Sequence, residues 1–107
     1  MSSLLAEQKL FLNFLMNTHS KQRKLLLSSV TREQLKVLGE IAANVIHSVI
    51  VLNPEEKKIL KKYKTFYLTL GDRDTSRKVK LRSLKRKEKA IVALLEIVKP
   101  FLTKWWK

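Results

Sequence analysis

A stripe of apolar side chains in residues 35–49 constrains the fold of this chain more than any other feature. Its members recur at spacings of three and four residues: Leu35, Leu38, Ile41, Ala42, Val45, Ile46 and Val49. This period matches one face of an α-helix and predicts a central helix that is buried along one side. Thr31 followed by Gln34 has the form of a capping box and predicts where that helix begins.

The segment "LNPEEKK" (52–58) predicts the next helix start. Asn53 suits the N-cap, Pro54 suits the first helical position, and Glu55 and Glu56 suit the positive end of the helix dipole. At about 100° per residue, the lysines of 57–64 lie on one side of this helix. The apolar residues lie on the other side, and we expect them to form core: Ile59, Leu60, Tyr63, Phe66, Tyr67 and Leu70.

The remaining helices are predicted at about residues 3–16, at 20–29 and from 77 onward. Ser20 is a candidate cap, and Gly71 suits the left-handed position that follows a helix. Glu88 interrupts the apolar stripe of the last segment and predicts a break within 83–90, while Pro100 predicts either a kinked extension or a separate foot. With only two Gly and two Pro in 107 residues, the chain is expected to be all-α, a small bundle of four to five helices in a single domain, 1–107.

The basic residues are concentrated in one third of the chain. The formal net charge is +14, yet residues 1–56 carry 6 basic and 5 acidic groups and residues 90–107 carry 3 and 1. Residues 57–89 carry 14 basic and 3 acidic groups, which makes the C-terminal half basic and amphipathic. A surface designed for solubility alone intersperses both signs, so this clustering favours a polyanionic partner.

The candidate nucleic-acid contacts are the cations of two predicted helical surfaces: Lys57, Lys58, Lys61, Lys62, Lys64, Arg77, Lys78, Lys80, Arg82, Lys85, Arg86 and Lys87. Residues 57–64 would span about 10 Å along a helix, which matches several phosphates of one strand. Lysine is a point charge without the bidentate fork that reads base edges. We therefore expect sequence-nonspecific binding and condensation of DNA, with duplex DNA favoured over RNA.

The C-terminal segment "PFLTKWWK" (100–107) leaves two interpretations open. Phe101, Leu102, Trp105 and Trp106 have the composition of an interfacial anchor, and they can contact an anionic membrane surface or a partner. They can equally fold back onto the core. A further alternative is a helical interaction module or homo-oligomer that docks through the apolar stripe of Leu81, Leu84, Ile91, Leu95 and Val98.

Several function classes receive no support from the sequence. His19 and His47 lie in different segments, and no metal-ligand spacing, phosphate loop or grouped carboxylate pair occurs, so we expect no enzyme, cofactor or metal. The absence of Cys and of N-x-[ST] motifs favours an intracellular setting such as the nucleus, or a virion. The N-terminus does not resemble a secretory signal, and the longest apolar run, "AIVALL" (90–95), is too short to be transmembrane.

Four short motifs occur in the order "QRKLLL" (22–27), "EIAANVI" (40–46), "LNPEEKKILKKYK" (52–64) and "SLKRK" (83–87). In this order the chain resembles the small basic core-like proteins of adenovirus-like mobile elements of the Polinton and adintovirus type. Those proteins are similar to the adenoviral mu core protein, which condenses DNA in the virion. The resemblance implies that the same twelve cations neutralise DNA. The segment "KAIVALLEIVKPFL" (89–102) departs from the family pattern because it lacks the glycines of the usual Gly-Gly-Phe-Leu turn.

Overall fold

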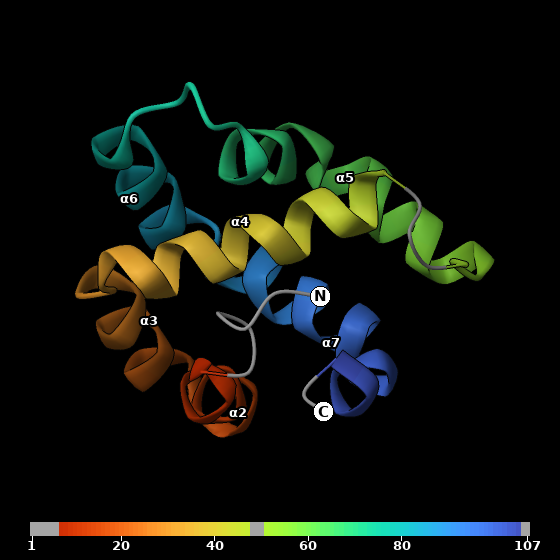
Figure 1. The fold of residues 1–107 in the computed structure, drawn as a ribbon, viewed down its shortest axis with the longest axis horizontal. Helices are drawn as coiled ribbons and strands as arrows, with labels where there is room; N and C mark the ends of the chain where they lie inside the picture. Colours follow the sequence, from red (N-terminus) through yellow and green to blue (C-terminus); the bar gives the residue numbers. More distant parts are fainter. Residues whose placement is uncertain (1–6, 48–50, 106–107) are drawn as a thin grey trace.

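Helix α4, Arg32–Ile46, crosses the middle of the computed structural model, which describes residues 7–47 and 51–105, with side chains up to Phe101 (Figure 1). The predicted capping box is confirmed: Thr31 Oγ1 accepts a hydrogen bond of 3.1 Å from the Gln34 backbone N–H, and the Gln34 side chain accepts one of 2.9 Å from the Thr31 N–H. Of the predicted stripe, Val49 lies outside the described residues and Ile46 is half-buried, whereas the other five members are buried.

Helix α5, Pro54–Gly71, begins where the sequence predicts. Asn53 Oδ1 accepts a 2.8 Å hydrogen bond from the Glu56 N–H, and Glu56 Oε1 accepts one of 2.9 Å from the Asn53 N–H. The helix is not continuous in geometry, because Tyr63 has non-helical dihedrals (φ −110°, ψ 15°) that mark a kink. Residues before and after Tyr63 therefore do not follow one helical wheel.

Glycines allow α4 and α5, the most extensively packed pair of helices, to approach each other closely. A Cβ on Gly39 would lie 2.5 Å from the carbonyl oxygen of Leu70, and a Cβ on Gly71 would lie 3.3 Å from the Cβ of Ala43. Gly71 is the last residue of the helix, so its predicted place in a left-handed turn after the helix is wrong. Gly71 lies in close contact with α4, and its φ is not in the left-handed region.

Helix α6, Arg77–Arg86, and helix α7, Glu88–Trp105, are separated at Lys87, within the predicted break. Ser76 caps α6 by accepting a hydrogen bond from the Val79 N–H. The break divides the last predicted helix, and six helices lie in the described residues in place of the four to five expected. Pro100 does not end α7, which continues to Trp105, so up to that residue the tail is an extension of the helix and not a separate foot.

The N-terminal part contains α2, Lys9–Asn17, and α3, Ser20–Ser28. Leu12, Leu15 and Leu27 are buried, whereas Leu25 is 64% exposed. The predicted cap at Ser20 is wrong, because His19 occupies the N-cap position and Ser20 is the first helical residue.

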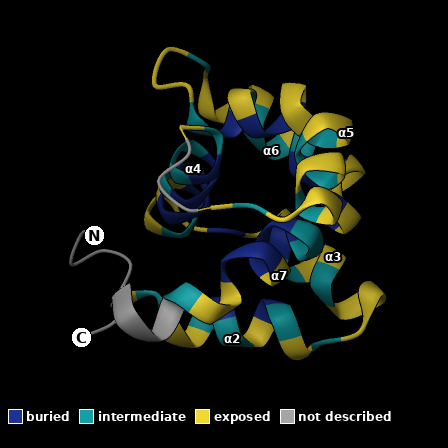
Figure 2. Ribbon diagram, turned by 90° about the vertical axis from the view of Figure 1, so that its right-hand side faces the viewer, coloured by how far each residue is buried: buried dark blue, intermediate teal, exposed yellow. Residues whose placement is uncertain are grey.

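The apolar C-terminal helix, α7, is the central helix of the bundle. Helix α7 contacts each of α2, α3, α4, α5 and α6. Its buried apolar side chains are Ala90, Ile91, Leu94, Leu95, Ile97 and Val98, and Figure 2 shows buried positions of α7 at the centre of the molecule. The Cα radius of gyration of 12.7 Å is close to the roughly 13 Å of a compact chain of this length.

Candidate nucleic-acid interface

The five predicted lysine contacts of α5 are exposed to solvent: Lys57, Lys58, Lys61, Lys62 and Lys64. After the kink at Tyr63, the helix carries Phe66, Tyr67 and Leu70, all of which are buried. Tyr67 also links α5 to α7, because its hydroxyl donates a 2.8 Å hydrogen bond to the carbonyl oxygen of Ala90. Burial, and secondarily the neighbouring Tyr63, raises the pKa of Tyr67 above its usual range. Packing of this aromatic side fixes which residues of α5 face water.

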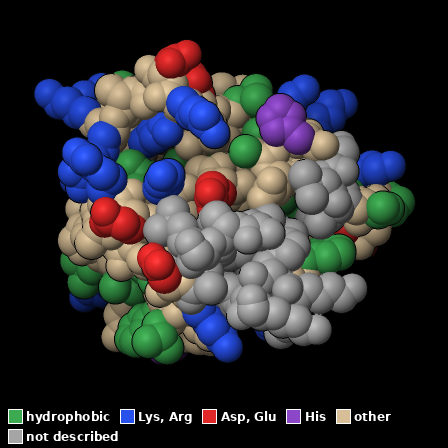
Figure 3. Space-filling model, in the orientation of Figure 1, with side chains coloured by type: hydrophobic (Ala, Val, Ile, Leu, Met, Phe, Trp, Pro, Cys, Tyr) green, Lys and Arg blue, Asp and Glu red, His purple; other side chains and the backbone are tan. Residues whose placement is uncertain are grey.

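The predicted cations of α6, together with Lys87, which follows it, are exposed with one exception. Arg77, Lys78, Arg82, Lys85, Arg86 and Lys87 are exposed, and Lys80 is half-buried. The Arg77 side chain donates a long hydrogen bond, 3.4 Å, to the carbonyl oxygen of Val30. On the face drawn in Figure 3, lysine and arginine side chains lie along the upper part of the molecule, and some acidic side chains lie among them.

The predicted cations are not held in ion pairs by carboxylates of the described residues. Among the described residues, none of the twelve forms an ion pair. The Lys62 ammonium lies 5.2 Å from the ring centroid of Tyr63, a cation–π contact that leaves its positive charge uncompensated. Unpaired ammonium and guanidinium groups on the surface remain available for an external anion.

A groove forms where α5, the end of α6 and the start of α7 meet. One hollow of about 290 Å³ is lined by Lys62, Tyr63, Thr65, Phe66, Thr69, Ser83, Arg86 and Lys87. A second hollow of about 370 Å³ is lined by Lys24, Tyr63, Lys85, Arg86, Lys87, Glu88, Lys89 and Ala90. Because Tyr63, Arg86 and Lys87 line both hollows, the two hollows are adjacent. We call the pair of hollows the basic groove, after its cations Lys24, Lys62, Lys85, Arg86, Lys87 and Lys89.

The basic groove brings together only part of the predicted set. Lys62, Lys85, Arg86 and Lys87 line it, whereas the other eight predicted cations do not. Of those eight, Lys80 lines a different hollow together with Lys36, Arg73 and Glu40. Lys24 and Lys89 were not among the predicted contacts. Tyr63, predicted as a core residue, is half-buried and packs against the core, and it also lines both hollows.

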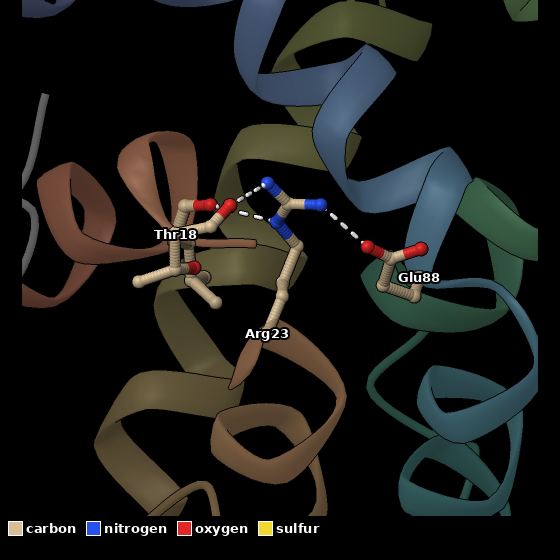
Figure 4. Close-up of polar contacts among 4 residues, drawn as sticks. Thr18, Arg23 and Glu88 are labelled. Carbon is tan, nitrogen blue, oxygen red and sulfur yellow. Dashed lines mark hydrogen bonds and ion pairs between the residues drawn. The ribbon is translucent and has the colours of Figure 1, made fainter. Parts of the chain in front are cut away.

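A buried ion pair lies beside the groove and was not predicted. Arg23 of α3 donates from Nη1 to Glu88 Oε1 and from Nε to the Leu15 carbonyl oxygen at 2.8 Å, and it also donates from Nη2 to the Thr18 carbonyl oxygen (Figure 4). Leu15 and Thr18 belong to the C-terminal end of α2, where carbonyl groups lack helical partners. Glu88 is the first residue of α7, where the helix dipole favours a carboxylate.

The loop between α5 and α6 is ordered by an aspartate. Asp72 Oδ1 accepts a 3.0 Å hydrogen bond from the Asp74 N–H, and Asp72 Oδ2 accepts one of 2.8 Å from the Thr75 hydroxyl. These two bonds, in that order of importance, lower the pKa of the Asp72 carboxyl, and the charge of Lys80 adds to the effect. The loop therefore helps to hold the two basic helices in a fixed relation.

The structure bears on the apolar C-terminal predictions only in part. Phe101 is half-buried and packs against the core, whereas Trp106 and the side chains of Leu102 and Trp105 lie outside the described residues. In the stripe proposed for self-association, Leu81 is half-buried and the other four members are buried within the chain. Within the part of the chain that is described, no helix combines the length and apolar character needed to cross a membrane.

Residues suited to catalysis are not grouped. His19 and His47 are both exposed and lie on different elements. Nowhere in residues 7–47 and 51–101 do three or more His, Asp or Glu side chains come together in a way that could hold a metal ion. The arrangement of side chains can attract and hold an anion by charge.

Comparison with known protein families, with curated proteins and with solved structures finds no match to this chain.

Proposed function

We propose that this protein binds and condenses double-stranded DNA without sequence preference and without catalysing a reaction. The observation that carries the proposal is that the cations of residues 57–64 and 77–87 are solvent-accessible, with only Lys80 half-buried, and have no carboxylate partner among the described residues. When such side chains contact the phosphates of DNA, they displace the counterions bound there, and the release of these counterions drives binding.

The chemistry of these side chains supports nonspecific contact over base reading. Lysines predominate on α5, and a lysine ammonium contacts phosphate as a point charge. Packaging of DNA in a virion core is the setting that the resemblance to element-encoded core proteins suggests. This part of the proposal depends on the resemblance alone, whereas DNA binding itself depends on the charged surface.

The test is a gel-shift titration of duplex DNA over a range of salt concentrations. We expect log K to fall linearly with log salt, by about 0.9 for each phosphate contacted. The triple variant Lys58→Glu, Lys61→Glu and Lys62→Glu should flatten that slope, equally for unrelated DNA sequences. A matched control changes three exposed lysines outside the basic region, Lys21, Lys36 and Lys99, to Glu and has the same net charge.

Two outcomes would overturn the proposal. A salt slope near zero for the wild-type protein would exclude counterion release as the driving force. Sedimentation with anionic vesicles in the absence of any DNA binding would assign the basic surface to lipid instead.

A further inference from the structure

The basic groove collects positive charge from four separate parts of the chain. Lys24 comes from α3, Lys62 from α5, Lys85 and Arg86 from the last turn of α6, and Lys89 from α7. Lys87 lies in the connection between α6 and α7. Because the sequence separation between Lys24 and Lys89 is large, only tertiary packing places these charges around one depression. The other eight predicted cations do not line this groove.

The single carboxylate that lines this groove is already neutralised. Glu88 is 4% exposed and is paired with Arg23, whose side chain is 11% exposed. An unpaired carboxylate at this position would repel phosphate and cancel part of the attraction of its neighbours. The ion pair with Arg23 therefore offsets the negative charge of Glu88 beside the groove cations.

The walls of the groove also suit an elongated anion more than an isolated ion. The two hollows, of about 290 and 370 Å³, adjoin each other along Tyr63, Arg86 and Lys87. Cations line both hollows, and Thr65, Thr69 and Ser83 add hydroxyl groups to the first. A depression with low-dielectric walls concentrates its electrostatic field more strongly than a convex helix surface with the same charge.

From these features we propose that the basic groove is the principal phosphate-contact site of the protein and holds consecutive backbone phosphates of one nucleic-acid strand. The inference rests on the proposed function and deepens it. It assigns the main contacts to Lys62, Lys85, Arg86 and Lys87, together with Lys24 and Lys89. The lysines at the start of α5 and the cations at the start of α6 then contribute only long-range attraction.

The test compares two triple variants of the full-length protein that have the same net charge. The groove variant carries Lys62→Gln, Arg86→Gln and Lys87→Gln, and the outer variant carries Lys57→Gln, Lys58→Gln and Arg77→Gln. All six side chains are exposed, and each variant loses two lysines and one arginine. Circular dichroism and thermal unfolding check that both fold. The single variants Arg86→Gln and Arg77→Gln provide the same comparison if a triple variant unfolds.

We measure binding of duplex DNA over a range of salt concentrations. For the groove variant, we expect the negative slope of log K against log salt to become shallower by about 2.7, which is about 0.9 for each of three lost phosphate contacts. The outer variant should lose less than a third of that amount. Equal losses in the two variants, or a larger loss in the outer variant, would overturn the groove assignment but leave nonspecific DNA binding intact. Absence of DNA binding by the wild-type protein would overturn the proposed function as well.

Discussion

Arg23 Nη1 lies 2.5 Å from Glu88 Oε1 and joins α3 to the start of α7 across 65 positions of sequence. The same guanidinium also binds two carbonyl groups at the end of α2, so one side chain connects three helices. Both partners are almost completely buried. A buried ion pair stabilises a protein little more than well-packed apolar residues at the same positions would. Removal of only one partner, however, strongly destabilises the protein.

Replacement of one partner should therefore destabilise the protein strongly. We expect Arg23→Met to lower the free energy of unfolding by about 3 kcal/mol, because it leaves the Glu88 carboxylate buried without its cation. The double variant Arg23→Met, Glu88→Leu should recover a large part of that loss. Urea unfolding of the wild type, both single variants and the double variant measures the coupling energy. Additive effects of the two substitutions would contradict the proposed interaction.

The hydroxyl of Thr18 offers a stabilising substitution. Its Oγ1 atom is buried and has no hydrogen-bond partner in the described part of the chain. The residue has extended backbone dihedrals (φ −94°, ψ 163°), which a β-branched residue tolerates. We expect Thr18→Val to raise the free energy of unfolding by about 1 kcal/mol, since a methyl group replaces an unsatisfied polar group. Thermal unfolding checks this, and a lowered midpoint would show that the hydroxyl has a partner.

Close packing of α4 against α5 should make Gly39 intolerant of a side chain. A Cβ there would lie 2.5 Å from the backbone oxygen of Leu70, which cannot move independently of its helix. We expect Gly39→Ala to cost about 1–3 kcal/mol, although alanine favours a helix more than glycine does. Gly71→Ala is the matched control, since its Cβ would meet Ala43 at 3.3 Å and should cost less. Equal stability of the two variants would argue against this helix contact.

Local sequence patterns predicted the features that depend on a few neighbouring residues. The capping box at Thr31 and the N-cap at Asn53 involve partners three residues away, and both are confirmed. The Glu56 side chain adds a second bond at Asn53 that was not predicted. The stripe of α4 predicted its buried side because helical period alone determines which residues share a face. The break near Glu88 was detectable because a carboxylate interrupted an apolar stripe.

The groove and the ion pair were not predictable in this way. Glu88 was visible only as an irregularity, and its partner Arg23 lies on another helix with no local sign of the pairing. Lys24 and Lys89 meet in the groove only because α3 and α7 pack together. The kink at Tyr63 also escaped the helical wheel, which assumes regular geometry through residues 57–70. Features of this kind depend on contacts between distant residues, which a periodic pattern does not encode.

The hydrogen bond from Tyr67 to the Ala90 carbonyl oxygen should make stability sensitive to alkaline pH. At neutral pH, we expect Tyr67→Phe to lower the free energy of unfolding by about 1–2 kcal/mol, because a buried carbonyl loses its donor.

The pKa of Tyr67 is raised in the folded state, by burial first and by Tyr63 second, so folding favours the neutral phenol. This contribution is complete below the unfolded pKa of about 10 and decreases as pH rises above it. Urea unfolding of both proteins between about pH 8 and pH 11 measures the difference between their free energies of unfolding. We expect that difference to be constant up to about pH 10 and to decrease above it. Both proteins share every other side chain, so a difference that stayed constant over the whole range would contradict the burial of this phenol.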